Sequence, residues 1–356
     1  MALIVDFLNH GLLPFVGRTE ELERLVRFAK GTVDAPELRL LLVVGEAGSG
    51  KSRLFAEGVD AMGAAGVLPI HLRIYPDTAG ALVPLVADAL TENPALTGLL
   101  REPVESSVVS VISALRRLAR LRSICLLVED IHLLEKGGLA EFARLGSGLF
   151  NESISIAAAA RPLPTEVRSA IEPYLVDELN IAGFESGDLV ALWGELLGSD
   201  GPSGLLEELA EATRGNPLAI RSALRGAFRS GAIELDGTIA TERSASIGSF
   251  FREGASRFGE GLAIGLVDEE REALGVLSHL GEIFAIETAS AMLGERADAM
   301  LEQLLFKGML AEASESAAPI GQNRSGQRLL IFTHTLVHRQ IFDEAEAPID
   351  QLVQAV

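Results

Sequence analysis

A glycine-rich loop that ends in a lysine and a serine is the first stretch of this sequence that could do chemistry. Glycines let the backbone turn successive N–H groups toward one anion, and a following helix adds the positive end of its dipole. The lysine can reach the β- and γ-phosphates of a nucleotide, and the serine hydroxyl can ligate Mg²⁺. A chance glycine-rich turn is the alternative, but the strand before the loop, the helix pattern after it and the complete eight-residue match favour a phosphate loop. The residues predicted to bind nucleotide here are Gly45, Glu46, Ala47, Gly48, Ser49, Gly50, Lys51, Ser52 and Arg53.

Two adjacent acids, Glu129 and Asp130, end a second apolar run. Nucleotide-bound Mg²⁺ needs a carboxylate, and hydrolysis needs another to orient the attacking water. By position we predict that Glu129 ligates the metal with Ser52 and that Asp130 faces the water. Arg161 ends a further apolar run and is expected to sense the γ-phosphate, with a solvated loop arginine as the alternative. The predicted catalytic set consists of four residues: Lys51, Glu129, Asp130 and Arg161.

The elements that position this chemistry are strands alternating with helices. The expected strands cover residues 40–44, 67–75, 123–128, 154–160 and 176–181. The first four are runs rich in apolar residues rather than strands that alternate in polarity, which indicates a parallel sheet covered on both faces. The fold class predicted is therefore α/β, a doubly wound parallel sheet with ligands at the carboxyl ends of its strands.

Beyond this sheet the pattern becomes helical, and it predicts further domains. Helical segments at 186–197, 204–213 and 217–230 form an all-helical lid, with Ser186 as a cap and Pro217 in a first turn. Three more helices and two short extended pieces predict a winged helix. The expected organisation is an N-terminal extension (1–14), a nucleotide-binding domain (15–183), the lid (184–235), a connector (236–265) and the winged-helix domain (266–356).

The amino-acid composition limits where in the cell this protein is expected and which partners it is expected to bind. The 356 residues carry a formal net charge of −20, which disfavours DNA binding, because basic side chains supply most of that affinity. The single cysteine, Cys125, lies in an apolar run and fits a reducing interior. We find no run near the about 18 apolar residues of a membrane helix and no basic leader. A cytoplasmic protein without a membrane partner is expected.

Several segments, in their order and spacing, resemble the ATPase core of the STAND class of AAA-related signalling ATPases, and more closely that of large LuxR/MalT-type bacterial regulators. They are FVGR (15–18), the phosphate loop, LLVEDIHLL (126–134), RP (161–162), TRGNPL (213–218) and FTH (332–334). The resemblance implies that Val16, Gly17 and Arg18 lie along the adenine and ribose, and that Pro217 packs against the base. It also implies that His334 contacts the β-phosphate of ADP; by itself this histidine would be a helix cap or a core residue.

The implied function is an ATP/ADP-dependent switch with slow ATP hydrolysis and Mg²⁺ as cofactor. ADP holds a closed state through His334, and ATP promotes an open or oligomeric state. Because sensor and effector domains of such regulators would lie elsewhere, we expect them in trans or beyond residue 356. Two alternatives stay open: an origin-recognition-like DNA-binding ATPase, and a nucleotide-binding scaffold without hydrolysis, motivated by the Glu-before-Asp order of the acid pair.

Overall fold

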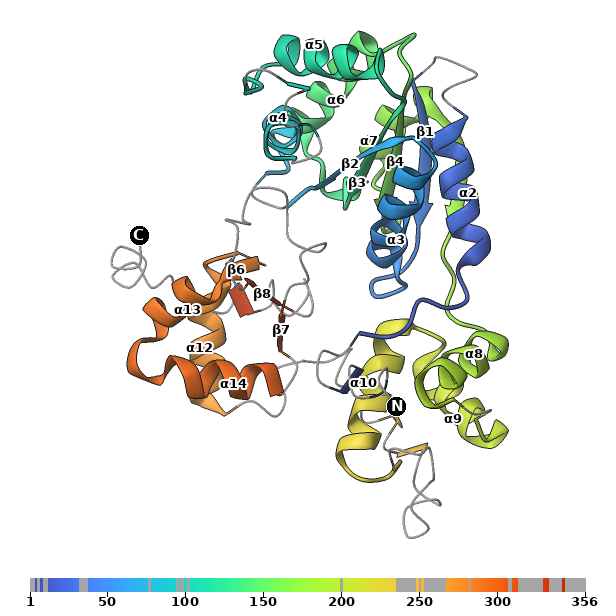
Figure 1. The fold of residues 1–356 in the computed structure, drawn as a ribbon, viewed down its shortest axis with the longest axis vertical. Coiled ribbons are helices and arrows are strands. Elements are labelled where there is room, and N and C mark those ends of the chain that lie inside the picture. Colours follow the sequence, from blue (N-terminus) through green and yellow to red (C-terminus); the bar gives the residue numbers. More distant parts are fainter. Residues whose placement is uncertain are drawn as a thin grey trace. The chain divides into compact units, whose positions relative to one another are not determined.

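The structure is a computed structural model with two compact units, residues 18–182 and a unit formed by residues 1–17 and 183–356 (Figure 1). It describes residues 4, 7–8, 12–31, 38–75, 78–93, 96, 99–100, 103–198, 201–234, 248–249, 251–252, 267–281, 283–306, 309–312, 329–332 and 341–342.

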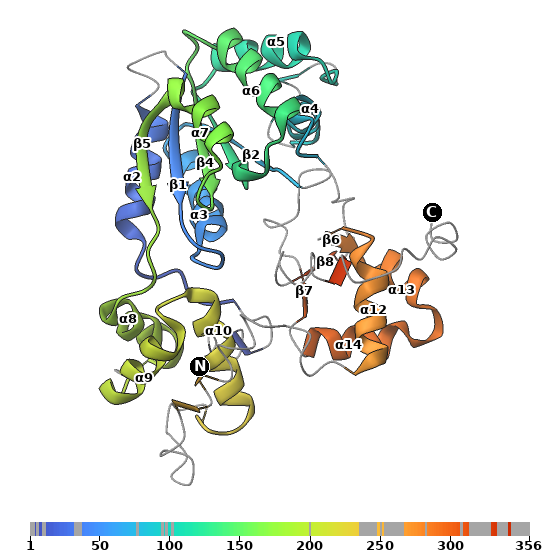
Figure 2. The same cartoon turned by 180° about the vertical axis from the view of Figure 1, so that it is seen from behind.

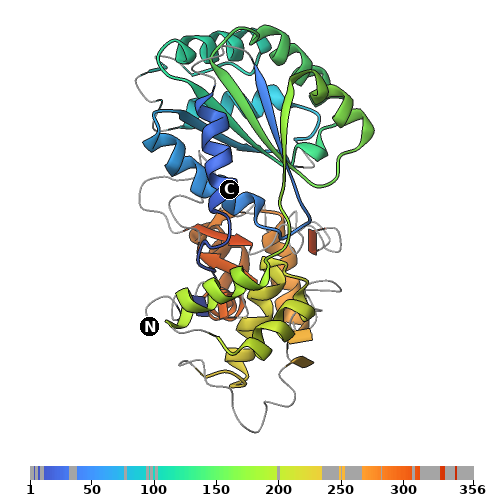
Figure 3. The same cartoon turned by 90° about the vertical axis from the view of Figure 1, so that its right-hand side faces the viewer.

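The first unit is built on a five-stranded sheet with the order β2-β3-β4-β1-β5, in which every neighbouring pair is parallel. Figure 3 shows its strands side by side. The parallel sheet predicted from apolar runs is confirmed, because β3 and β4 are buried along their whole length. The strands are β1 (Arg39–Val44), β2 (Leu68–Arg73), β3 (Ile124–Glu129), β4 (Ile154–Ala160) and β5 (Leu175–Asn180).

Helices cover both faces of this sheet, with α2 and α3 on one face and α4, α5 and α6 on the other (Figures 1 and 2). The even-numbered strand residues, such as Leu42, Ile70 and Leu126, pack into the core beneath α4, α5 and α6. The helices are α2 (Thr19–Lys30), α3 (Lys51–Ala64), α4 (Leu82–Glu92), α5 (Val108–Ala119), α6 (Lys136–Gly148) and α7 (Thr165–Ile171).

One face of β2 is polar and half-buried, unlike the inner strands. Leu68, Ile70 and Leu72 are buried, and the residues between them are not. The parallel register pairs His71 with Leu127 and Arg73 with Glu129. Side chains two residues apart share a strand face, so His71 and Arg73 lie on the face that carries Glu129.

The second unit contains α8 (Ser186–Leu197), α9 (Ser203–Thr213) and α10 (Pro217–Arg229). Pro217 lies in the first turn of α10, as predicted, and Asn216 caps that helix. Ser186 was expected to be a cap, but α8 begins at Ser186 and Glu185 caps it. The segment expected as an N-terminal extension contributes Ile4 and Phe7 to the core of these helices, and both are almost fully buried. The hydrophobic periodicity of this segment is weak, so the sequence did not predict that it packs into a core.

Three further helices and an antiparallel sheet lie later in this unit. The sheet has the order β6-β8-β7, and the three-residue strand β6 was not among the expected strands. The elements are α12 (Asp268–Ser278), β6 (Ile283–Ala285), α13 (Ile286–Leu293), α14 (Ala297–Phe306), β7 (Leu310–Glu312) and β8 (Leu329–Phe332). Across the described residues, the helices are too short or too polar to cross a membrane.

Candidate functional site

The glycine-rich loop joins β1 to α3, as the sequence predicts. Gly48 and Gly50 have φ values of 76° and 99°, in the left-handed region where a side chain is unfavourable. Gly50 occupies the cap position of α3 and so cannot cap the helix with a side chain. The first N–H groups of an α-helix have no acceptor within the helix, so this end of α3 is suited to an anion.

Gly45 has a steric reason to be glycine. A Cβ there would lie 2.6 Å from Ser49 Oγ and 2.9 Å from the carbonyl oxygen of Ile181. Its N–H donates to the Ala160 carbonyl at 3.2 Å. The loop therefore starts in a narrow space between the ends of β4 and β5.

Lys51 lies along this loop and is 9% exposed. Its ammonium donates to the carbonyl oxygens of Gly45 and Glu46, at 2.8 and 2.9 Å. Burial lowers the pKa of Lys51, and the nearby charge of Asp130 opposes that shift. An ammonium has three protons, so one N–H remains beyond these two bonds for a phosphate oxygen.

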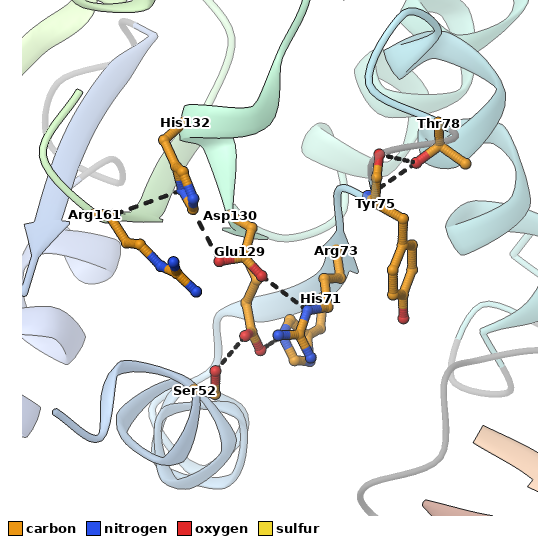
Figure 4. A network of polar contacts seen from close by, with 9 residues as sticks. All are labelled: Ser52, His71, Arg73, Tyr75, Thr78, Glu129, Asp130, His132 and Arg161. Carbon is orange, nitrogen blue, oxygen red and sulfur yellow. Dashed lines mark hydrogen bonds and ion pairs between the residues drawn. The ribbon is translucent and has the colours of Figure 1, made fainter. Parts of the chain in front are cut away.

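Glu129 ends β3 beside the start of α3, with 5% of its surface exposed. The Ser52 hydroxyl donates to its Oε2, and His71 Nε2 lies 2.7 Å from its Oε1 (Figure 4). Burial by itself would raise the pKa of Glu129, but the hydrogen bond from His71 and the charge of Arg73 outweigh it, and the pKa falls to about 2. Glu129 is thus a carboxylate, and His71 Nε2 carries the shared proton.

Asp130 follows with a φ of 56°, a left-handed conformation that aspartate tolerates better than most residues. Arg73 Nε donates to Asp130 Oδ2 at 2.9 Å, and His132 Nδ1 lies 3.9 Å from Oδ1. The backbone N–H of Arg161 lies 3.5 Å from His132 Nδ1, and its guanidinium points toward the acid pair (Figure 4). The structure therefore brings together Ser52 and all four predicted catalytic residues.

Three residues of this network, His71, Arg73 and His132, were not predicted from the sequence, and two of them lie on β2. The run at residues 67–75 was interpreted as one apolar strand, although polar residues alternate with apolar ones in its second half. That period of two marks a strand with one face toward something polar. Because this strand lies next to the acid pair, the alternation is the signal that could have identified His71 and Arg73.

The remaining predicted residues of the first unit are accounted for differently. Arg18 is buried, donates to Glu21 Oε1 at 2.9 Å and to the Ala182 carbonyl, and so joins the start of α2 to the chain leaving β5. Arg53 lies exposed on α3 and pairs with Glu57 at 2.7 Å, which directs its side chain away from the loop. Only the backbone N–H of Arg53, in the first turn of α3, is placed to donate a hydrogen bond to a phosphate.

Predicted base-binding elements of the second unit converge on the start of α8. Gly17, with a φ of 65°, lies against Asp188: a Cβ on Gly17 would be 2.2 Å from Asp188 Oδ1. The loop before Pro217 meets the same region, because the Phe184 N–H donates to the Gly215 carbonyl at 2.6 Å. Val16 packs at the edge of the adjoining core. His334 lies outside the described residues.

These residues fit Mg²⁺ and a nucleotide by their donor chemistry. The Ser49 hydroxyl in the loop is buried, and no hydrogen-bond partner is found for it among the described residues. Among all the residues that the structure describes, no group of three or more His, Cys, Asp or Glu side chains could hold a metal ion alone. Mg²⁺ bound with a nucleotide is usually held by one or two protein groups together with phosphate oxygens and water. Ser52 and Glu129 would supply the protein groups.

The parallel sheet, the loop between β1 and α3 and the acids at the end of β3 define the fold of a P-loop ATPase. A family model described as an AAA ATPase domain matches residues 14–155. Comparison with the curated proteins found no match.

Solved structures of P-loop ATPases have a similar fold. A signal transduction ATPase with numerous domains and a tetratricopeptide repeat sensor, from Pyrococcus horikoshii, gives a TM-score of 0.51 at 15% identity over 96% of this chain and 45% of that chain. The ORC2 protein of Aeropyrum pernix gives 0.50 at 13% identity, over 95% of this chain and 97% of the other. Drosophila ORC bound to DNA gives 0.51 at 12% identity, over 95% and 90%. This chain thus spans less than half of the Pyrococcus protein.

Proposed function

We propose that this protein is a switch that binds ATP and ADP and hydrolyses ATP slowly. The observation that carries the proposal is the contact of Ser52 with Glu129 at the start of α3, beside the Lys51 ammonium. Two predicted metal ligands from separate elements meet there, next to a loop shaped for phosphates. The match of residues 14–155 to the AAA ATPase domain supports a nucleotide as the ligand.

In this proposal each residue has a distinct task. Lys51 binds the β- and γ-phosphates through its remaining N–H, and Ser52 and Glu129 hold Mg²⁺, which neutralises charge on the phosphate oxygens. Arg161 extends toward the γ-phosphate. Asp130 orients the attacking water.

Slow turnover is supported by the arrangement of Asp130. One of its oxygens accepts a hydrogen bond from Arg73 and the other faces His132. A carboxylate engaged by a guanidinium is a poor acceptor for a water proton, so Asp130 must leave Arg73 before it can act. Turnover that disappears in Asp130→Asn would support hydrolysis, and a wild type without turnover would favour the scaffold.

The switch itself rests on the family resemblance and on the second unit. The helices α8 to α10 are the proposed lid, and α12 to α14 with the sheet β6-β8-β7 are the proposed winged helix. ADP would hold the closed state through Pro217 and His334. Converting a mostly closed population to a mostly open one takes about 5.5 kcal/mol of differential affinity, more than one phosphate contact supplies, so a partner protein, a sensor domain or a second copy of the chain adds the rest.

An origin-recognition-like ATPase is the second candidate, favoured by the fold shared with the Aeropyrum and Drosophila ORC structures. Against DNA binding, Asp298 and Glu302 are exposed on α14, the helix that would face a duplex in such a winged helix. Salt-sensitive binding of a duplex in a gel-shift assay would favour this candidate over the signalling switch.

The experiment that tests the switch is to identify the nucleotide that co-purifies with the protein and to measure its release. We expect ADP, released faster from His334→Ala than from wild type. Release at the same rate would remove the proposed lock while leaving nucleotide binding intact.

A further inference from the structure

Both carboxylate oxygens of Glu129 are engaged, and by different elements. Ser52 at the start of α3 donates to Oε2, and His71 on β2 approaches Oε1 at 2.7 Å. Figure 4 shows the carboxylate between these two side chains. Arg73, two residues further along β2, bonds to Asp130 instead. His71 is therefore the side chain of β2 that orients the predicted metal ligand.

The His71 ring is itself held in place. It lies edge-on to Phe55 of α3, with 6.4 Å between ring centroids and 81° between ring planes. The register of β2 against β3 places His71 opposite Leu127, one side chain before Glu129 on the same face. A helix and a strand thus fix the ring, and the ring limits how the carboxylate can rotate.

We propose that His71 is a positioning residue for the magnesium ligand Glu129. Its Nε2–H holds Oε1, so that Oε2, the oxygen that contacts Ser52, would be the one available to the metal. If Ser52 and Glu129 held Mg²⁺, their mutual hydrogen bond would be lost, and the bond from His71 would remain. Hydrogen bonds to ligating groups typically contribute 10- to 100-fold in metal affinity. This inference rests on the proposed nucleotide and Mg²⁺ site.

The test is the Mg²⁺ dependence of ATP binding, measured by isothermal titration calorimetry on the full chain freed of nucleotide. His71→Phe keeps an aromatic ring against Phe55 but removes the donor, and His71→Gln restores an N–H. Titrating Mg²⁺ at fixed ATP, we expect His71→Phe to need about 10- to 100-fold more metal than wild type, and His71→Gln to recover part of the loss. In EDTA, all three proteins should bind ATP with the same affinity.

A matched control is His279→Phe, which changes the half-buried histidine at the C-terminal cap of α12, whose Nδ1 lies 2.9 Å from the Gly275 carbonyl oxygen. It should leave the Mg²⁺ dependence unchanged. His71→Met, a second variant without the donor, replaces His71→Phe if the latter lacks the far-UV spectrum of the wild type. A donor-free variant with wild-type Mg²⁺ dependence, or one that loses affinity equally in EDTA, would overturn the inference. A wild type indifferent to Mg²⁺ would also overturn it, whereas a wild type that binds no ATP at all would refute the proposed function.

Discussion

Replacing Glu129 by glutamine should change how stability depends on pH. The pKa of Glu129 is about 2 in the folded protein, against a usual value of 4.5. A depressed pKa stabilises the folded state above the unfolded-state value, and that stabilisation is lost as the pH falls toward the folded-state value. The difference corresponds to about 3 kcal/mol at neutral pH, of which roughly 2 kcal/mol is lost between pH 6 and pH 3.

The assay is urea unfolding of wild type and Glu129→Gln in EDTA without nucleotide. Far-UV circular dichroism is the suitable signal, because the single tryptophan, Trp193, lies in the other unit. Subtracting the two free energies of unfolding cancels the titration of the other groups. The stability advantage of the wild type should shrink by roughly 2 kcal/mol from pH 6 to pH 3. A difference that stays constant over this range would refute the hydrogen-bonded, charge-paired environment assigned to Glu129.

Two further predictions test residues of the second unit against control substitutions, and the free energy of unfolding is measured for each variant. A Cβ on Gly215, where φ is 70°, would lie 2.3 Å from the Phe184 carbonyl oxygen, so Gly215→Ala should cost at least about 2 kcal/mol. Gly63→Ala on α3, where nothing lies within 4 Å, should be neutral or stabilising by up to about 1 kcal/mol, and equal effects would contradict the loop geometry. Phe7→Ala should cost about 3 to 5 kcal/mol because Phe7 is fully buried, while Leu12→Ala, at an exposed site, should change stability by less than about 0.5 kcal/mol. A small effect of Phe7→Ala on the free energy of unfolding would contradict the packing of the N-terminal segment into the core.

The inner strands and the phosphate loop were predictable because their signals are local. The bounds of β4 and α8 agree with those expected from sequence. A continuous apolar run specifies a buried parallel strand, and the spacing of glycine, lysine and serine specifies the loop. The acids Glu129 and Asp130 could be placed at the same sheet edge because the carboxyl ends of parallel strands share one edge.

What the sequence did not reveal depends on contacts between distant segments. Two partners of the acid pair come from β2, and only the strand order brings His71 and Arg73 beside Glu129 and Asp130. The helices α6 and α7 were not predicted. Two glycines follow Lys136 in the first turn of α6, where a Cβ on either would lie 2.5 Å from a backbone carbonyl oxygen of residue 79 or 80. That close approach explains a helix start with poor helix formers.

The central claim is that the loop between β1 and α3 binds an adenine nucleotide. Isothermal titration of the nucleotide-free full chain with ADP and with ATP plus Mg²⁺ tests it most directly, with Lys51→Ala as the comparison. We expect saturable binding by the wild type and at least a 100-fold loss, about 2.7 kcal/mol, in Lys51→Ala, because the ammonium is the cation of the loop. No binding by the folded wild type, or equal binding by Lys51→Ala, would contradict the account.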